Sequence, residues 1–423
     1  MPAIQPVKGT RDFYPEDLAF RRWLHDHLRD VSASFGYQEY DGPFLERLEL
    51  YAAKSGEELV KEQSFVFPDR GGDLIALRPE LTPSLARMVA TRGQALNLPL
   101  RWWSFGPFWR YERPQKGRTR EFFQWNIDLL GPESPQADAE LAAIAAEFFH
   151  AVGLGPETVN LLVNDRRLAE SQLQAIGLPS SSHKEIFRLI DRRDKMAPPA
   201  WAGLAREMGL AAEQFAALQH ILDDKQAWRS SPSLQAFFTA AEQLGATPYL
   251  EYDPTVIRGL DYYTGTVFEA RDRSGKHRAI LGGGRYDNLV ADVGGDPVPG
   301  VGFAMGDVVL SLVLEAHGVL PSLSPSPTQV LVTSFDDAGL LPAIRLAARL
   351  RQAGLRAEWY PQAGRLPRQM KYADRLAIPF VVILGPEELA SDSATLKDLR
   401  SGQQEFLPLE ELPSAILSRV AAG

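Results

Sequence analysis

The sequence predicts an α+β protein with a mainly sheet-forming body, a helical insertion and a separate C-terminal α/β domain. Three observations lead to this prediction. Short aromatic and β-branched runs alternate with Gly, Pro and Asp turns from residue 36 to about residue 130. Residues 166–244 are almost wholly helical in pattern. After a Ser- and Pro-rich stretch at 322–327, strand-like and helix-like segments alternate in β-α-β-α-β order.

Length and composition exclude several classes of protein. The 423 residues, 45% hydrophobic and 23% charged, have ordinary globular values and can form two or three domains. The lack of cysteine excludes disulfides, thiolate metal sites and a cysteine nucleophile. The N-terminus does not resemble a signal peptide and no 18-residue apolar run occurs, so we expect a cytoplasmic protein without a membrane partner. At a formal net charge of −9, binding to a polyanion requires a local basic patch.

Periodicity predicts the elements of the body in order. Apolar residues from Leu18 to Val31 have helical spacing and Gly36 follows as a stop, which predicts a helix over 17–35. Asp165 is a candidate cap for the first helix of the insertion. The other elements expected here are strands at 64–67 and 100–105, a helix at 136–153, a strand at 158–164, and strands within 248–270 and at 277–282.

The C-terminal segments predict a small domain of their own. Strand-like runs at 330–335, 356–361 and 380–385 are separated by helical patterns at 338–353 and 366–376. Residues 345–375 hold eight basic and two acidic side chains, which favours one RNA-facing side, although a solvated amphipathic helix has the same pattern. The full division expected is a body at 1–165 and 245–321, an insertion at 166–244, a linker at 322–327 and a tail at 328–423.

Residues 101–120 are the densest functional candidate. They carry six basic side chains against one acid, in a pattern typical of a strand that ends in an arginine-rich loop with Gly117 at its tip. Guanidinium groups on such a loop suit phosphate oxygens, because their planar donors match them. A solvated charged hairpin explains the composition equally well.

Other patterns leave alternatives open or exclude chemistry. The segments 77–83 and 257–265 place charged residues within apolar runs, so each holds either structural ion pairs or a ligand site. The glycines at 282–284 indicate either close backbone packing or a ligand site. No P-loop, GxSxG or HExxH motif occurs, and the seven histidines are scattered without metal-ligand spacing.

Taken together, these motifs resemble the histidyl-tRNA synthetases, a family of class II aminoacyl-tRNA synthetases, in order over nearly the whole chain. KGTRD at 8–12, with the following helix and Pro43, is similar to family motif 1. FWRYERPQKGR at 108–118, continuing to FFQ at 122–124, resembles motif 2, which the whole class shares. RGLDYY at 258–263 and GGRYD at 283–287 resemble the two histidine-specific signatures. The resemblance implies a class II antiparallel-sheet catalytic domain with a helical insertion and a C-terminal anticodon-binding domain.

The resemblance also implies roles for individual residues. Arg258 and Arg110 are the expected catalytic residues, which neutralise charge while the histidine carboxylate attacks the α-phosphorus of ATP. The residues expected to bind histidine are Glu80, Thr82, Arg110, Gln124, Asp128, Arg258, Tyr262 and Tyr263. Those expected to bind ATP are Arg110, Glu112 and Arg118, and those expected to contact tRNA are Arg113, Gln115, Lys116, Arg118 and Arg120.

The function that this resemblance implies is ATP-dependent ligation of L-histidine to tRNA(His) by a homodimer, with Mg²⁺ on the nucleotide and no assigned metal ligands. One departure stands out: Val309 lies where motif 3 commonly has an arginine. The alternatives are a non-catalytic histidine-binding paralogue that regulates ATP phosphoribosyltransferase and a tRNA-binding sensor. The presence of the C-terminal tail, RGLDYY and the motif 2 arginines favours the ligase.

Overall fold

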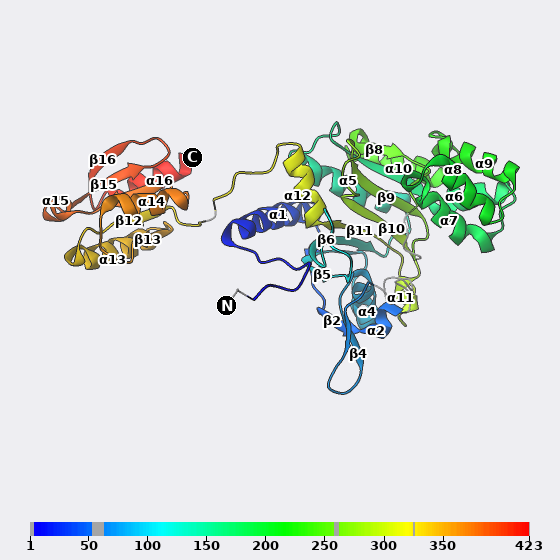
Figure 1. Cartoon of the computed structure of the whole chain (residues 1–423), viewed down its shortest axis with the longest axis horizontal. Coiled ribbons are helices and arrows are strands. Elements are labelled where there is room, and N and C mark those ends of the chain that lie inside the picture. Colours follow the sequence, from blue (N-terminus) through cyan, green and yellow to red (C-terminus); the bar gives the residue numbers. More distant parts are fainter. Residues whose placement is uncertain (1–3, 53–62, 258–261, 325, 423) are drawn as a thin grey trace. The chain divides into compact units, whose positions relative to one another are not determined.

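The computed structural model in Figure 1 describes residues 4–52, 63–257, 262–324 and 326–422. It divides into two compact units. One comprises residues 1–12 and 24–320, and the other comprises residues 13–23 and 321–423. Helix α1 (Pro15–Ser34) runs through the boundary at residue 24. None of the helices in the described ranges is long and apolar enough to cross a membrane.

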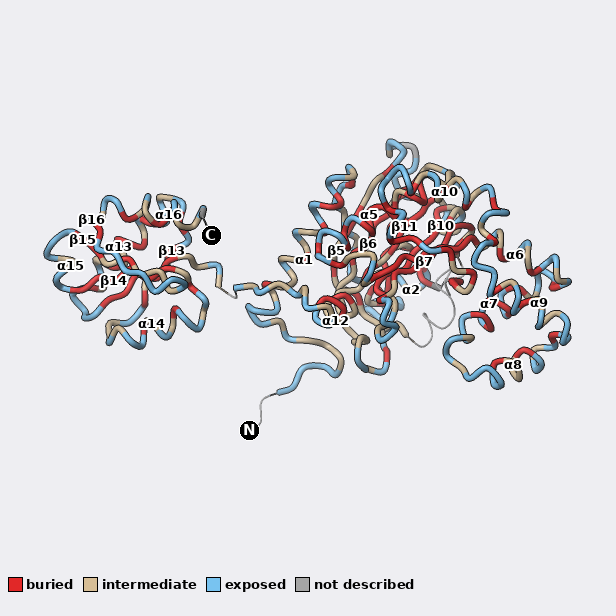
Figure 2. The backbone as a smooth tube through the Cα atoms, turned by 90° about the horizontal axis from the view of Figure 1, so that it is seen from above, coloured by how far each residue is buried: buried red, intermediate tan, exposed pale blue. Residues whose placement is uncertain are grey.

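An eight-stranded sheet forms the centre of the first unit. Its strands pair antiparallel except at the two edges, where β1 pairs parallel with β5 and β8 with β7. In sheet order the strands are β1 (Gln38–Glu39), β5 (Leu100–Trp109), β6 (Glu121–Leu130), β11 (Gly300–Gly306), β10 (Leu281–Tyr286), β9 (Thr266–Asp272), β7 (Val159–Asp165) and β8 (Leu250–Tyr252). Figure 2 shows that the central strands are the most buried part of this unit.

Helix α5 (Pro135–Ala151) packs on the central strands. It begins where the Ser134 hydroxyl accepts a hydrogen bond from the Ala137 amide at 3.3 Å. The Trp125 ring of β6 lies 5.3 Å from the Phe148 ring of α5 and 5.0 Å from the Phe303 ring of β11. One face of the sheet is therefore filled by aromatic packing against α5, which leaves the other face for polar side chains.

Shorter elements surround this sheet. A three-stranded sheet has the order β2 (Leu45–Arg47), β4 (Leu74–Leu77) and β3 (Val66–Pro68). The remaining elements outside the helical insertion are α2 (Leu48–Ala52), α4 (Thr82–Arg92), η1 (Gly93–Ala95), η5 (Thr247–Tyr249), α11 (Leu289–Asp292) and α12 (Asp307–Ala316).

The chain between β7 and β8 is helical. The Asp165 carboxylate accepts a hydrogen bond from the Arg167 amide at 2.8 Å and caps the first helix, which confirms its predicted capping role. The elements are α6 (Arg166–Ala175), η2 (Ser180–Ser182), α7 (His183–Asp191), η3 (Arg193–Lys195), α8 (Pro198–Glu207), α9 (Ala212–Asp223), η4 (Ala227–Ser230) and α10 (Pro232–Gln243). Helices α6 to α9 share one apolar core, whereas α10 packs on α5 of the body.

The second unit holds a five-stranded sheet with helices on both faces. Its strands, in sheet order, are β13 (Ala357–Trp359), β12 (Val330–Val332), β14 (Phe380–Ile383), β15 (Ser393–Asp398) and β16 (Gln404–Pro408). The helices are α13 (Asp337–Gln352), α14 (Leu366–Arg375), α15 (Pro386–Ala390) and α16 (Leu412–Ala422). Along the chain, β12, α13, β13, α14 and β14 follow the predicted β-α-β-α-β order. Strands β15 and β16 then extend the sheet in antiparallel pairing.

The sequence favoured a single basic side for this unit, but its basic residues lie on two faces. Helix α13 packs with Val330 and Val332, whereas α14 packs with Leu331, whose side chain points to the other face of β12. Because most of the basic residues lie on these two helices, the sheet separates them into two groups. The prediction of a single basic side is therefore wrong.

The strand predicted at 277–282 is also displaced. Strand β10 begins at Leu281, because the buried Asp272 carboxylate organises the preceding residues into a loop. That carboxylate accepts hydrogen bonds from the Ser274 amide at 3.1 Å and the His277 ring at 2.7 Å. The sequence did not predict strand β11, because its glycines lack the side chains from which a strand is recognised.

Candidate active site

Strand β6 presents a row of polar side chains on the face opposite α5. Gln124, Asn126 and Asp128 line one cavity, whereas the alternate residues Trp125 and Ile127 are buried in the apolar core. This follows from the two-residue period of a strand, since successive side chains point to opposite faces. The cavity is therefore built on the centre of the sheet.

Strand β11 leaves room for these polar groups. Its residues opposite Asp128, Asn126 and Gln124 are Gly302, Ala304 and Gly306. A Cβ atom on Gly302 would lie 2.1 Å from Asp128 Oδ1, which is far inside contact distance. Only glycine at 302 therefore permits the Asp128 carboxylate to take this position.

The first cavity has a volume of about 190 Å³. It gathers seven of the eight side chains predicted to bind histidine, which are Glu80, Thr82, Arg110, Gln124, Asp128, Tyr262 and Tyr263. The eighth, Arg258, lies outside the described residues. The Tyr262 hydroxyl donates a hydrogen bond to Glu80 Oε2 at 3.3 Å, so Glu80 from the loop before α4 and Tyr262 from before β9 meet directly.

Asp128 is an acid of this cavity whose pKa is shifted. Burial raises its pKa to about 7, although a hydrogen bond from the Tyr286 hydroxyl to Asp128 Oδ1, at 2.5 Å, opposes the shift. The carboxyl group therefore changes charge near neutral pH. A ligand that donates a hydrogen bond to it favours the charged form.

A second cavity of about 300 Å³ adjoins the first. The two share Arg110, Gln124, Gly282 and Ala304 as lining residues. The Arg110 guanidinium is held by a hydrogen bond from Nε to the Pro79 carbonyl at 3.0 Å and lies 5.2 Å from the centre of the Phe122 ring. A cation is thus fixed where the two cavities meet.

The loop between β5 and β6 forms part of the second cavity. Gly117 has a φ of +76° at its tip, a conformation that favours glycine, and the backbones of Gln115 and Arg118 pair across the turn. Glu112 and Arg118 both line the cavity and form an ion pair with each other. Two of the residues predicted to bind ATP are therefore joined in this structure.

The remaining loop residues divide into two groups. Arg113, Gln115 and Lys116 are exposed. Arg120 is packed instead: its Nε donates to the Glu112 carbonyl at 3.1 Å, and its guanidinium lies 4.1 Å from the centre of the Tyr111 ring. Of the residues predicted to contact tRNA, Arg113, Gln115 and Lys116 are therefore the ones that an RNA molecule in solution can reach directly.

Both open alternatives for the segment 77–83 hold, each for a different residue. Arg78 is completely buried and structural, because its guanidinium pairs with Asp41 at 2.5 Å and donates to the Pro107 and Gly42 carbonyls. Glu80, two residues later, lines the first cavity. The tertiary partners of each side chain therefore decide which charge is structural.

The glycines at 282–284 also divide. A Cβ atom on Gly283 would lie 2.3 Å from the Gly302 carbonyl oxygen, and one on Gly284 would lie 2.7 Å from the Thr266 carbonyl oxygen. These two permit close strand packing, whereas Gly282 lines both cavities.

Several residues that line the cavities were absent from the predicted site, among them Asn126, Tyr286 and Arg278. Asn126 and Tyr286 line the first cavity and Arg278 lines the second. The alternation of polar and apolar residues at 124–129 contains a signal for Asn126, and the GGRYD signature contains Tyr286. Nothing in the local sequence distinguishes Arg278 from other surface arginines.

Comparison with known proteins agrees with this geometry. The family model described as histidyl-tRNA synthetase matches residues 9–307, which include every residue that lines the first cavity and all that line the second except Val308 and Val309. The chain belongs to the histidyl-tRNA synthetase family. An anticodon-binding domain model matches residues 329–419. The histidine–tRNA ligase of Halobacterium salinarum is 40% identical over 423 residues, 97% of each chain. The chloroplastic/mitochondrial histidine–tRNA ligase of Arabidopsis thaliana is 37% identical, over 97% of this chain and 86% of its own.

Solved structures of histidyl-tRNA synthetases share the fold of this chain. The enzyme of Nostoc sp. PCC 7120 superposes with a TM-score of 0.84 at 26% identity, over 99% of this chain and 100% of that one. A Bacillus halodurans protein described as an ATP phosphoribosyltransferase regulatory subunit/histidyl-tRNA synthetase has a TM-score of 0.75 at 20% identity, over 91% and 99%. At that identity the likeness concerns the fold alone.

Proposed function

We propose that this protein is a histidine–tRNA ligase, which activates L-histidine with ATP and then transfers it to the 3′ end of tRNA(His). The observation that carries the proposal is the pair of adjoining cavities with Arg110 between them. One is small and lined by groups that can hydrogen-bond an ammonium and an imidazole. The other is lined by arginines, which suit a triphosphate.

In the first cavity, Glu80 and Thr82 receive the α-ammonium of histidine, since an anion and a hydroxyl oxygen both accept its hydrogen bonds. Gln124, Asp128 and Tyr263 surround the imidazole. Tyr262 positions Glu80 through their hydrogen bond. This arrangement leaves the histidine carboxylate to face the second cavity.

In the second cavity, Glu112 lies near the adenine amino group, and Arg118 binds the terminal phosphate. Their mutual ion pair must open when ATP enters. Arg110 binds the α-phosphate, because it is the cation common to both cavities. The family resemblance implies the same task for Arg258, which lies outside the described residues.

The first step needs no protein nucleophile. A histidine carboxylate oxygen bonds to the α-phosphorus while the bond from that phosphorus to the β-bridging oxygen breaks, and pyrophosphate leaves. Arg110 lowers the barrier by neutralising charge on the α-phosphate, and the two cavities hold the reactants together. In the second step the oxygen of the terminal ribose hydroxyl of tRNA bonds to the histidine carbonyl carbon and gives up its proton, while the bond from that carbon to the phosphate oxygen breaks and AMP leaves.

Magnesium fits this site as a companion of the nucleotide. Among the described residues no three His, Cys, Asp or Glu side chains gather where they could hold a metal ion. Mg²⁺ prefers oxygen ligands and keeps several waters, so the phosphates of ATP and water would supply most of its ligands. When bound, it neutralises phosphate charge.

Exchange of pyrophosphate into ATP tests the proposal. Exchange that depends on histidine, and on none of the other nineteen amino acids, is the expected result. Binding of histidine without any exchange would contradict the ligase and favour the regulatory paralogue.

Histidine binding is expected to depend on pH through Asp128. As the pH falls through about 7, Asp128 takes up a proton and can no longer accept a hydrogen bond from the imidazole as an anion. The KM for histidine should therefore rise as the pH falls from 8 to 6. Asp128→Asn should raise KM by about tenfold at pH 8.

At each pH, the ratio of the KM of Asp128→Asn to the KM of the wild type isolates this effect, because titration of free histidine affects both proteins equally. We expect the ratio of mutant to wild type to shrink towards acid pH. A ratio that stays constant from pH 6 to pH 8 would remove Asp128 titration from histidine binding.

Deleting residues 328–423 is expected to impair charging of tRNA far more than activation of histidine. The matched anticodon-binding model lies within this segment, while both cavities lie in the first unit. Pyrophosphate exchange by the shortened chain serves as the folding control. Charging of tRNA(His) at an unchanged kcat/KM would contradict the anticodon-binding role.

A homodimer is part of the proposal. The three-stranded sheet exposes Leu45, Phe67 and Leu74, with 47%, 41% and 52% of each residue accessible, and exposed apolar patches mark interaction sites. Light scattering should therefore give twice the chain mass of 46.9 kDa. A monodisperse species of one chain mass would contradict the dimer.

A further inference from the structure

The loop between β9 and β10 brings an unassigned arginine into the second cavity. Arg278 lines this cavity together with Gly117 and Val309. A Cβ atom on Gly117 would lie 3.7 Å from Val309 Cγ2 and 3.9 Å from Arg278 Cδ. The Arg278 side chain, the tip of the β5–β6 loop and Val309 therefore converge at one place.

The charges of this cavity are unbalanced. Arg110, Arg118 and Arg278 contribute three guanidinium groups, whereas Glu112 contributes one carboxylate, which is already paired with Arg118. No carboxylate of the described residues forms an ion pair with Arg278. An anion with several phosphate groups would supply the missing charge.

The backbone around Arg278 is anchored. The fully buried Asp272 carboxylate accepts hydrogen bonds from the neighbouring His277 ring at 2.7 Å and from the His317 ring, just beyond α12, at 3.1 Å. On the other side of Arg278, the Ile280 amide donates to the Ala270 carbonyl at 2.8 Å. The loop therefore fixes the backbone from which the exposed Arg278 reaches the cavity before any ligand arrives, and a fixed backbone helps to preorganise a binding group.

We infer that Arg278 binds the terminal phosphates of ATP and replaces the arginine that the family commonly has at the position of Val309. This inference rests on the proposed ATP-dependent reaction. The guanidinium offers paired donors to phosphate oxygens from the β9–β10 loop, whereas an arginine at 309 would offer them from the first turn of α12. Both positions face the same part of the cavity.

Arg278→Ala tests the inference, with Lys276→Ala as the matched control. Lys276 is exposed on the same loop and carries the same charge, but it does not line the cavity. We expect Arg278→Ala to raise the KM for ATP in pyrophosphate exchange by about ten- to a hundredfold, with the KM for histidine unchanged. Lys276→Ala should change both values less than about twofold.

A second substitution tests the replacement directly. Adding Val309→Arg to Arg278→Ala should recover at least part of the lost ATP affinity, because the new guanidinium reaches the same phosphates. Failure to recover any affinity would overturn the replacement. Equal effects of Arg278→Ala and Lys276→Ala, or an equal rise in both KM values, would overturn phosphate binding by Arg278.

Calorimetric titration of the full chain with ATP, without histidine, separates this inference from the proposed function. Weaker ATP binding by Arg278→Ala supports the phosphate contact even if wild-type protein lacks histidine-dependent exchange. If Arg278→Ala binds ATP as tightly as the wild type does, and the wild type exchanges pyrophosphate, the inference is wrong and the ligase proposal stands.

Discussion

Arg110→Ala is expected to lower the kcat of histidine-dependent pyrophosphate exchange by roughly 10²–10³-fold. Its guanidinium lies where the two cavities meet and is fixed by the Pro79 carbonyl and the Phe122 ring. Charge that develops on the α-phosphate during the reaction is met there by a group that needs no rearrangement. Loss of this group removes stabilisation of the transition state.

Two further variants make the test of Arg110 specific. Arg110→Lys keeps the charge but loses the paired donors, so its activity should lie between those of wild type and Arg110→Ala. Arg113→Ala removes an exposed arginine of the same loop and should leave exchange within about twofold. Near-normal kcat in Arg110→Ala would exclude Arg110 from the chemical step.

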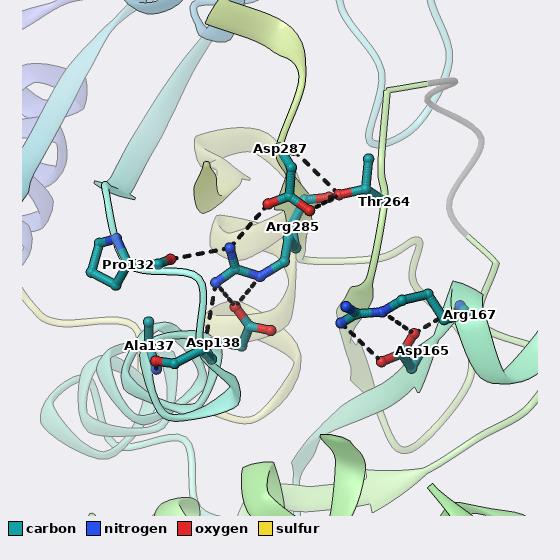
Figure 3. A network of polar contacts seen from close by, with 9 residues as sticks. Pro132, Ala137, Asp138, Asp165, Arg167, Thr264, Arg285 and Asp287 are labelled. Atoms are coloured by element: carbon teal, nitrogen blue, oxygen red, sulfur yellow. Dashed lines mark hydrogen bonds and ion pairs between the residues drawn. The ribbon is translucent and has the colours of Figure 1, made fainter. Parts of the chain in front are cut away.

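Arg285→Ala is expected to destabilise the first unit by about 3–5 kcal/mol. Figure 3 shows its guanidinium bonded to Asp138 of α5, to the Pro132 carbonyl and to Asp287. Both side chains of the Arg285–Asp138 pair are at most 2% exposed. Removing the cation would leave the Asp138 carboxylate buried without its ionic partner.

Urea unfolding followed by tryptophan fluorescence measures this loss, because, of the eight tryptophans, only Trp23 and Trp359 belong to the second unit. Asp138→Leu combined with Arg285→Met removes both charges and should recover much of the lost stability. An unfolding midpoint of Arg285→Ala equal to that of wild type would show that the pair contributes no net stability.

The family resemblance, rather than any local pattern, indicated Gln124 and Asp128 as site residues. Both line the first cavity, where the alternation of strand β6 puts them on one face. The sequence could not separate Arg78 from Glu80, because the difference depends on Asp41, which lies far away in the sequence. The GGRYD signature likewise combines a structural Arg285 with Tyr286, which lines the cavity.

Long-range pairing also explains what the fold prediction missed. Strand β11 is recognisable only from its partners β6 and β10, whose register fixes it despite its glycines. The role of Arg278 depends on a loop that Asp272 and His317 hold together across 45 residues. Such contacts lie outside the range of local periodicity and turn chemistry.

The wall common to the two cavities has a thermodynamic consequence. Arg110, Gln124, Gly282 and Ala304 face both ligands, so a shift of this wall in response to one ligand changes the affinity for the other. By linkage, the factor by which bound histidine alters the dissociation constant of ATP equals the factor by which ATP alters that of histidine. A substitution in this wall therefore changes a coupling free energy as well as two separate affinities. Titrating each substrate in the presence and absence of the other measures that coupling directly.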